Sequence, residues 1–217
     1  MTTKLPDMLA PRRTKSKGKP KRGRLIAIEG LDGSGKSTVS RGLAQALGAE
    51  WTTTPGLALR ACGLRDLADK HLSDRTALHL FYAASVVEES GRIKALLAAG
   101  RDVVVDRWWL STWAYAKVDG SPLALAEVEA QVLAADRTVW LDLPEPERCR
   151  RLRERGMSEA DRRTLDPTYA NELRQLYIQG LRRRVAGQAV VLPVAGLSVL
   201  EVIDHVVAAV LEHDLAA

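Results

Sequence analysis

Residues 30–37 read Gly-Leu-Asp-Gly-Ser-Gly-Lys-Ser and fit the pattern G-x-x-x-x-G-K-[S/T]. An apolar run at residues 25–28 comes directly before them, and a stretch with helical spacing of apolar residues follows. Glycines let the backbone turn its N–H groups inward around an anion, and the positive end of the following helix points to the same place. The strand, loop and helix together predict a phosphate-binding loop for a nucleoside triphosphate, with a lysine charge at position 36 and a hydroxyl for magnesium at position 37.

The order of the apolar segments predicts the fold. Strands are expected at residues 25–28, 50–53, 103–105, 138–143 and 189–194, and helices at 38–47, 65–97, 109–115, 124–135, 146–155, 171–185 and 198–211. The predicted strands are apolar throughout, which is typical of a parallel sheet buried on both faces. We therefore predict an α/β fold of the P-loop NTPase type: a three-layer sandwich in which a five-stranded parallel sheet has helices on both faces and a helical lid.

The first 24 residues differ in composition from the rest of the chain. They hold nine basic residues and one acidic residue, a net charge of +8, whereas the whole chain of 217 residues carries +5. The remainder therefore carries about −3, and the basic character belongs to this tail. We expect residues 1–24 to be a disordered basic tail, because few apolar side chains are present to offset the entropy of ordering. A nucleic acid or an acidic partner for the tail, or a targeting role, stays open. Residues 25–217 are expected to form one domain.

No hydrophobic segment in the sequence suggests a membrane or an export signal. No run of 18 apolar residues occurs, and no apolar stretch of about 7 to 15 residues follows the N-terminal charges. Cys62 and Cys149 are far apart and the four histidines are scattered, so neither a disulfide framework nor a zinc site is indicated. We expect a cytoplasmic protein that does not bind membranes.

An acidic and a basic residue, Asp106 and Arg107, follow the third predicted strand. Ligands of parallel sheets bind beyond the carboxyl ends of the strands, so these side chains should meet the phosphate loop there. A carboxylate in that place can hold magnesium or its water, and a guanidinium can clamp a phosphate through two hydrogen bonds. The pair therefore suits phosphoryl transfer, with a plain ion pair at a strand end as the alternative interpretation.

Arginines are concentrated between residues 148 and 163, on both sides of Gly156. The segment has turn character between two helices and predicts a mobile lid at about residues 150–166. Arginines on a closing lid can neutralise the charge that develops on a transferred phosphoryl group. Arg155 and Arg162 flank the turn and are the preferred candidates, and for each of them a solvated helix face is the alternative.

These motifs resemble those of the thymidylate kinases, a family of nucleoside monophosphate kinases. The matching stretches are residues 29–38, 80–81, 106–108 with 111–115, 135–138 leading to 141–142, and 153–156 leading to 161–162. The resemblance runs from about residue 24 to the end of the chain. It implies a magnesium-dependent enzyme that transfers the gamma phosphate of ATP to a nucleoside monophosphate, with dTMP as the first candidate, and it implies a homodimer.

The resemblance also assigns roles to individual residues. It implies catalytic roles for Lys36, Asp106, Arg107, Arg155 and Arg162, with Ser37 and Asp106 at the magnesium ion. The residues that it implies for ATP binding are Gly30, Asp32, Gly33, Ser34, Gly35, Lys36, Ser37 and Thr38. The residues that it implies for the acceptor are Asp32, Phe81, Ser85, Arg107, Ser111 and Tyr115, with Phe81 stacked on the base and Tyr115 beside the sugar. Because position 33 is glycine, the family pattern places the catalytic arginine in the lid.

The acceptor side departs from the family pattern. Bacterial members read Thr-Arg-Glu-Pro-Gly after the second strand, and here Thr53 stands in place of the arginine that contacts the acceptor phosphate. Ser85 stands where the family has an arginine that reads a thymine carbonyl. Each lost charge-assisted hydrogen bond weakens binding by about 1.5 to 3 kcal/mol unless another group replaces it. Arg60 and Arg65 are candidates to replace the phosphate contact because they lie close to Gly56 in sequence.

Three functions therefore stay open. The first is a kinase of a nucleoside monophosphate, with dTMP first among the acceptors. The second keeps the chemistry but acts on a modified nucleotide, a nucleoside or a small hydroxyl metabolite, and the residues at positions 53 and 85 favour it. The third is a nucleotide-binding protein without turnover, against which the intact Lys36 and Asp106 argue. The tryptophans at positions 108, 109 and 113 are interpreted either as core residues or as an aromatic wall for a different acceptor.

Overall fold

The structure is a computed structural model that describes residues 22–211, without the side chains of Glu159 and Ala160. Residues 1–21, which make up most of the predicted basic tail, lie outside the described residues. Arg22 and Arg24 lie within them, where Arg22 pairs with Asp136 at 2.9 Å and Arg24 pairs with Asp102 at 2.6 Å. In the described part of the chain, none of the helices combines the length and the apolar composition needed to span a bilayer.

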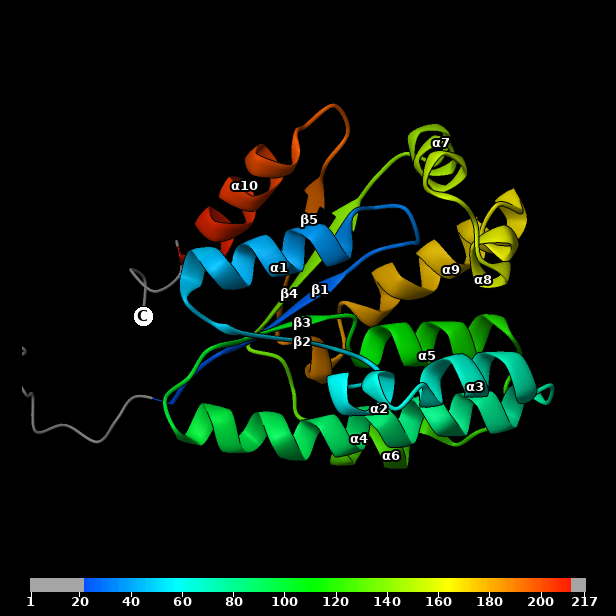
Figure 1. Ribbon diagram of the computed structural model, residues 1–217, viewed down its shortest axis with the longest axis horizontal. Helices are drawn as coiled ribbons and strands as arrows, with labels where there is room; N and C mark the ends of the chain where they lie inside the picture. The colour runs from blue at the N-terminus through cyan, green and yellow to red at the C-terminus, as the bar shows by residue number, and fades with distance from the viewer. Residues whose placement is uncertain (1–21, 212–217) are drawn as a thin grey trace, which may run out of the picture.

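A parallel sheet of five strands forms the central layer (Figure 1). The strands are β1 (Leu25–Glu29), β2 (Glu50–Thr53), β3 (Val103–Asp106), β4 (Arg137–Asp142) and β5 (Gln188–Pro193). Their order is β2-β3-β1-β4-β5, and Asp106 is in register with Thr53 of β2 and with Ile28 of β1. The carboxyl ends of β1, β2 and β3 therefore meet at one edge of the sheet, and the predicted α/β fold class is confirmed.

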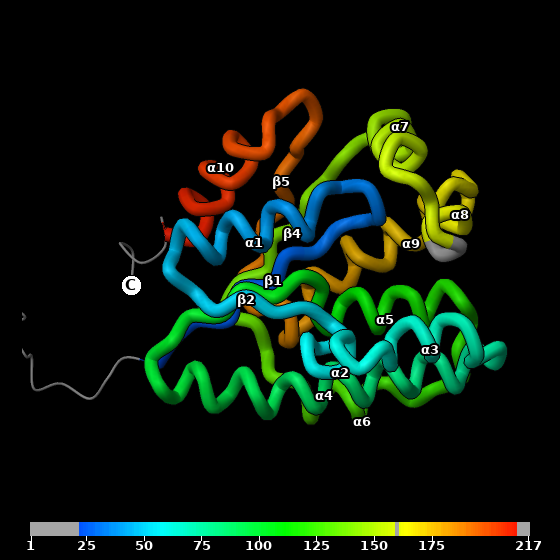
Figure 2. Tube along the Cα trace, viewed as in Figure 1, coloured from blue at the N-terminus to red at the C-terminus, as the bar shows by residue number. Residues whose placement is uncertain are grey.

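Helices cover both faces of this sheet (Figures 1 and 2). The helices are α1 (Lys36–Leu47), α2 (Leu57–Ala61), α3 (Leu64–His71), α4 (Arg75–Ala98), α5 (Trp109–Val118), α6 (Leu125–Gln131), α7 (Glu145–Arg155), α8 (Glu159–Arg163), α9 (Pro167–Gly180) and α10 (Val199–Leu211), with a 3-10 turn η1 at Arg184–Ala186. Helices α1 and α10 lie on one face, and α4, α5 and α9 lie on the other.

Alternate residues of each central strand pack into two separate hydrophobic cores, one on each face of the sheet. Ile26 and Ile28 of β1 pack toward α1 and α10, whereas Leu25 and Ala27 pack toward α4, α5 and α9. This alternation follows from the pleat, which sends successive side chains to opposite faces. The tryptophans at positions 108, 109 and 113 are buried in the second core and do not line the cavity described below, which agrees with their interpretation as core residues.

Two of the predicted elements differ from the structure in an informative way. The helix expected at residues 65–97 is two helices, because the side chain of Asp74 accepts a hydrogen bond from the Ala77 amide at 2.9 Å and starts α4 anew. Apolar spacing continues on both sides of this break and hides it. The strand expected to be buried at 189–194 is an edge strand, and most of its residues are half-buried or exposed.

Gly187 joins η1 to β5 at a close approach of two backbones. It has a φ of 60°, and a Cβ atom there would overlap the carbonyl oxygen of Ala135. Gly48 has nearly the same φ, 62°, and a Cβ atom there would meet nothing within 4 Å. Because the two glycines share a backbone conformation and differ only in the room available for a Cβ atom, they form a matched pair for substitution.

We predict that Gly48→Ala lowers the free energy of unfolding by about 1 kcal/mol, the cost of the positive φ alone. Gly187→Ala should cost about 1 to 3 kcal/mol more, because the backbone of Ala135 and Asp136, just before β4, has to move. Equilibrium unfolding in urea measures both values. Equal losses for the two variants would contradict the packing described for Gly187.

Candidate active site

Glycines and one buried ammonium shape the phosphate loop between β1 and α1. Gly33 has a φ of 89°, and a Cβ atom on it would lie 2.9 Å from the Arg148 carbonyl oxygen. Lys36 is buried and donates from Nζ to the Leu31 carbonyl at 2.8 Å. Burial lowers the pKa of Lys36 to about 8, and the charge of Arg107 acts in the same direction. The loop therefore concentrates donors and positive charge around a space suited to an anion.

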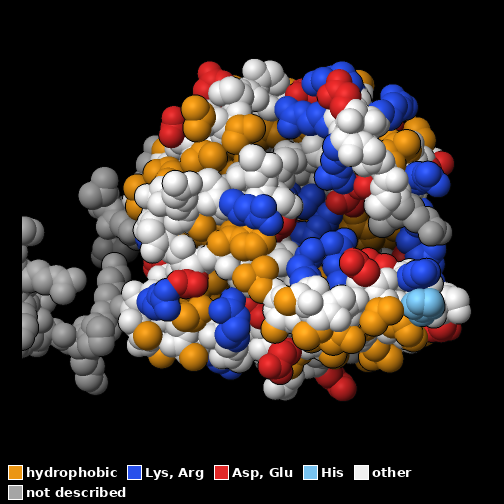
Figure 3. All heavy atoms as spheres, viewed as in Figure 1, with side chains coloured by type: hydrophobic (Ala, Val, Ile, Leu, Met, Phe, Trp, Pro, Cys, Tyr) orange, Lys and Arg blue, Asp and Glu red, His pale blue; other side chains and the backbone are white. Residues whose placement is uncertain are grey.

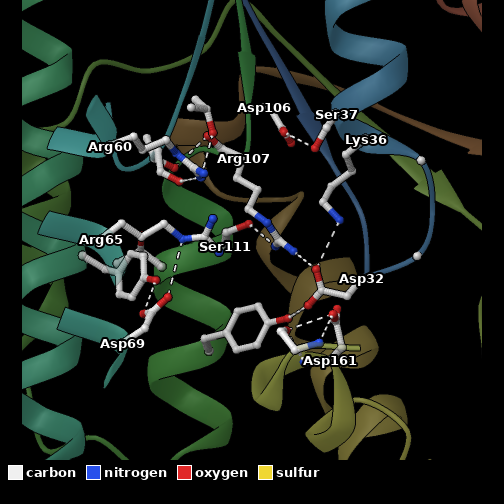
Figure 4. Close-up of a pocket in the computed structure, with 18 of the residues that line it drawn as sticks. Asp32, Lys36, Ser37, Arg60, Arg65, Asp69, Asp106, Arg107, Ser111 and Asp161 are labelled. Carbon is white, nitrogen blue, oxygen red and sulfur yellow. Dashed lines mark hydrogen bonds and ion pairs between the residues drawn. The ribbon is translucent and has the colours of Figure 1, made fainter. Parts of the chain in front are cut away.

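Ser37 and Asp106 bring a hydroxyl and a carboxylate together beside this loop (Figure 4). Ser37 Oγ donates to Asp106 Oδ2 at 2.5 Å, and the buried Asp106 Oδ1 has no hydrogen-bond partner among the described residues. Magnesium prefers oxygen ligands and commonly takes one or two from the protein and the rest from phosphates and water. Since no cluster of three metal-ligating side chains occurs within residues 22–211, the pair fits a magnesium ion that arrives with phosphate.

Arg107 crosses the cavity from the end of β3. Its φ of 66° is uncommon for a residue with a Cβ atom, and this backbone conformation turns the side chain toward the phosphate loop. The guanidinium forms an ion pair with Asp32 and donates to the Ser111 hydroxyl at 3.1 Å and the Tyr177 hydroxyl at 3.4 Å. Three side chains from different elements therefore hold the Arg107 guanidinium in one orientation, and Figure 4 shows Asp32 and Ser111 beside it.

A buried carboxyl group, Glu29, fixes the turn that follows Arg107. It accepts hydrogen bonds from the Trp108 amide at 2.8 Å and from the Ser111 hydroxyl at 2.7 Å. Because the Ser111 proton points to Glu29, the Ser111 oxygen accepts from the Tyr177 hydroxyl at 2.7 Å. Burial raises the pKa of Glu29, and these hydrogen bonds oppose the rise. Glu29 and Tyr177 were not among the predicted site residues.

Asp32 is the acidic centre of the phosphate loop. Its second oxygen accepts a hydrogen bond from the Tyr115 hydroxyl at 2.7 Å, and Lys36 Nζ lies 3.8 Å from the first. Burial alone would raise the pKa of Asp32, but the charges of Arg107 and Lys36 lower it well below its usual value. The carboxylate is therefore ionised and holds two cations of the site in place.

These groups border a cavity of about 650 Å³, visible as a hollow with Lys and Arg side chains around it (Figure 3). The predicted residues that line it are Asp32, Gly33, Gly35, Lys36, Ser37, Thr38, Asp106, Arg107, Ser111, Tyr115 and Arg155. The predicted residues that do not line it are Gly30, Ser34, Phe81, Ser85 and Arg162. Most of the predicted donor side therefore meets in one place, whereas part of the predicted acceptor side does not.

Helix α4 turns Tyr82, rather than Phe81, toward the cavity. Successive helical residues point about 100° apart, so the two rings cannot share one direction. Ser85 is buried, and its hydroxyl donates to the Tyr82 carbonyl at 2.7 Å. The acceptor roles that the resemblance implies for Phe81 and Ser85 stay predictions, and neither side chain lines the cavity here.

The arginine-rich segment, residues 148–163, is joined to the phosphate loop by Arg148. This buried guanidinium donates to the Asp32 carbonyl at 3.3 Å and to Thr164 Oγ1 at 3.1 Å. It therefore links α7, the loop and the end of α8. The sequence indicated an arginine-rich region but gave no reason to prefer this residue, because its partners are a backbone carbonyl and a distant threonine. Closure of the segment as a lid stays a prediction.

The two preferred arginines of this segment have different surroundings. Arg155 lines the cavity and pairs with Asp161 at 2.7 Å, while Asp161 also caps α8 through Ser158. Arg162 is exposed and does not line the cavity, whereas the neighbouring Arg163 does. Helical geometry decides which of two adjacent arginines faces the cavity, and this cannot be inferred from a run of consecutive arginines in the sequence.

Asp119, at the end of α5, joins four helices at the far end of the cavity. Its carboxylate accepts hydrogen bonds from Arg75 at 3.1 Å and Tyr169 at 3.0 Å, lies 3.2 Å from His79 Nε2, and pairs with Arg163. The side chain is 3% exposed. Although burial opposes the shift, hydrogen bonds from His79 and Arg163 lower the pKa of Asp119 well below its usual value. No sequence motif indicates this cluster, because each partner is 40 or more positions away.

A phosphate loop, a carboxylate free to bind magnesium and arginines from two sides of one cavity are the parts of a phosphoryl-transfer site. The fold and the site thus define a P-loop kinase. A family model described as thymidylate kinase matches residues 28–193. A thymidylate kinase of Glaesserella parasuis serovar 5 is 33% identical over 174 residues, which cover 72% of this chain and 82% of that protein. The chain belongs to the thymidylate kinase family.

Solved structures have the same fold. A thymidylate kinase from Candida albicans superposes with a TM-score of 0.69 at 21% identity and covers 89% of this chain and 92% of its own. A deoxyadenosine kinase from M. mycoides superposes with a TM-score of 0.64 at 20% identity and covers 86% of this chain and 98% of its own. The fold therefore occurs in kinases named for different acceptors, and the acceptor has to be argued from the cavity.

We predict that Asp119→Asn destabilises the protein at pH 7, because an amide cannot balance the charges of Arg75 and Arg163. The folded-state pKa of Asp119 is depressed, so its stabilisation is fully present above the unfolded value of about 3.8 and is lost as the pH falls further. The difference between wild type and variant should therefore shrink below about pH 4. Unfolding in urea across pH measures it, with the exposed Asp204→Asn as control. A difference independent of pH would contradict this role.

Proposed function

We propose that this chain is a thymidylate kinase that transfers the gamma phosphate of ATP to dTMP, giving ADP and dTDP in the cytoplasm. The observation that carries the proposal is the convergence of Lys36, Asp106 and Arg107 on one cavity at the carboxyl ends of β1 and β3. Family membership supports dTMP as the acceptor.

Each of these residues has a task in the transfer. Lys36 and the loop amides bind the donor phosphates, and Arg107 binds phosphate oxygens on the acceptor side. An acceptor phosphate oxygen attacks the gamma phosphorus as the bond to the bridging oxygen of ADP breaks, and Arg155 neutralises the charge that develops. Ser37 and Asp106 would hold a magnesium ion, which draws negative charge from the phosphates when bound.

A second candidate keeps this chemistry and changes the acceptor. It is favoured by Tyr82, which lines the cavity while Phe81 and Ser85 do not. A tyrosine ring with its hydroxyl bound to Asp69 at 2.6 Å presents a different surface from a phenylalanine with an arginine one turn away. The donor side is the same for both candidates, so only a comparison of acceptors separates them.

We expect ATP turnover with magnesium to be fastest with dTMP in a panel of dUMP, the other nucleoside monophosphates and thymidine. Lys36→Ala should lower that turnover more than tenfold without unfolding the protein, because the ammonium that binds the donor phosphates is removed. The exposed Lys94→Ala serves as control. A Lys36→Ala rate above a tenth of wild type would contradict its role, and preference for another acceptor would support the second candidate.

We further propose a homodimer that buries leucines exposed on the surface of α3 and α4. Leu67 is 52% exposed and Leu80 is 50% exposed, and Figure 3 shows apolar side chains gathered over α3. Contiguous exposed apolar surface of this kind is typical of an interface. Light scattering should give twice the chain mass for wild type and for Leu200→Glu, a change on α10, but the single mass for a Leu67→Glu, Leu80→Glu double variant. A monomeric wild type would refute the dimer.

A further inference from the structure

Arg60, on α2, has no carboxylate bound directly to its guanidinium among the described residues. Its Nε donates to the Pro55 carbonyl at 3.0 Å, and its Nη2 donates to Thr53 Oγ1 and to the Thr54 carbonyl, both at 3.2 Å. All three acceptors are neutral oxygens, and Arg60 forms no ion pair within residues 22–211. The side chain is half-buried and lines the cavity. Its guanidinium is thus fixed in direction and has no ion-pair partner among the described residues.

The segment that holds Arg60 is itself tied to the reaction centre. Thr53 is in register with Asp106, and Thr54 Oγ1 donates to the Arg107 carbonyl at 2.9 Å. Nη1 of Arg60 makes no hydrogen bond with the described residues, so two of its N–H donors are left for a ligand. Arg60 therefore has free N–H donors, and the segment that binds its side chain, residues 53–54, is also hydrogen-bonded to the backbone of Arg107.

Two more guanidinium groups lie near Arg60 (Figure 4). Burial lowers the pKa of Arg60, and the charges of Arg65 and Arg107 act in the same direction, whereas the charge of Asp106 opposes them. Arg107 has Asp32 as its acidic partner, and Arg65 lies 3.5 Å from Asp69. Cations gathered in one cavity repel one another unless an anion binds among them. Of the three, Arg60 lacks a carboxylate partner among the described residues, so it gains most from an anionic ligand.

We propose that Arg60 binds the phosphate group of the acceptor together with Arg107, so that the acceptor class is a nucleoside monophosphate and not a nucleoside. The inference rests on the proposed function, because it needs an acceptor in this cavity. A guanidinium matches a phosphate through two parallel N–H···O bonds, which a lysine cannot reproduce. Arg60 thereby supplies from a helix the contact that Thr53, at the end of β2, cannot make.

Arg60 variants would behave differently if Arg60 had a purely structural role and did not bind phosphate. Its bonds to the Thr54 and Pro55 carbonyls also join α2 to the end of β2, so removing them can loosen the loop. Arg60→Gln keeps a donor for these carbonyls and removes the charge, whereas Arg60→Lys keeps the charge and removes the fork. A comparison of acceptors with and without a phosphate then distinguishes phosphate binding by Arg60 from structural support of the loop after β2.

The test measures KM for dTMP, KM for ATP and turnover of thymidine with the full-length chain. Arg60→Gln should raise the KM for dTMP by about 10- to 100-fold, the loss expected for a hydrogen bond to a charged group. The KM for ATP should stay within about twofold, and Arg60→Lys should give an intermediate value. Arg182→Gln, an exposed change just after the C-terminal end of α9, is the matched control and should leave both constants unchanged.

The measurements distinguish failure of the proposed dTMP kinase activity from failure of the proposed role of Arg60. If another monophosphate replaces dTMP as the best acceptor and Arg60→Gln raises its KM, the role of Arg60 stands and the assignment of dTMP falls. An unchanged acceptor KM in Arg60→Gln, an equal rise of KM for ATP, or turnover of nucleosides alone would overturn the role of Arg60. Absence of turnover with every monophosphate would overturn both proposals.

Discussion

The geometry of the site depends on one buried carboxyl group, Glu29, at the end of the central strand. It binds the Trp108 amide and the Ser111 hydroxyl, and so fixes the turn between β3 and α5. That turn sets the unusual backbone conformation of Arg107, and the hydroxyl of Ser111 passes the constraint on to Tyr177 of α9. An unpaired polar group in this position would be costly, so the turn has little freedom to take another shape.

Carboxylates organise the arginines of the cavity in the same way. Asp32 holds Arg107 at the phosphate loop, Asp161 holds Arg155 on the arginine-rich segment, and Asp119 joins that segment to α4 and α5. These pairs keep most of the positive charge balanced before any ligand binds. Arg60, by contrast, is held by neutral oxygens and has no ion-pair partner among the described residues. The distribution of acids therefore distinguishes Arg107, Arg155 and Arg163, which are held in ion pairs, from Arg60.

Local patterns in the sequence identified the parts of the site whose chemistry is contiguous in the chain. The loop at 30–37 and the pair of Asp106 and Arg107 were found because a buried strand precedes each of them. The sequence patterns did not decide between adjacent helical residues: Tyr82 rather than Phe81 and Arg163 rather than Arg162 line the cavity, and the roles of Phe81 and Arg162 stay predictions. A resemblance aligns positions along the chain, but a rotation of about 100° between neighbours decides which side chain faces a ligand.

The sequence by itself determined the class of fold and predicted the phosphate loop, because both follow from residue types at fixed short spacing, and the family resemblance indicated the missing arginine at position 53. Only the tertiary structure decided the roles of Glu29, Asp119, Arg148 and Arg60. Glu29, Asp119 and Arg148 act through partners on other elements, many of them far away in the chain, and no periodicity carries that information. Arg60 is close to Thr53 in sequence, yet its lack of an ion-pair partner among the described residues is known only once the surrounding elements are in place.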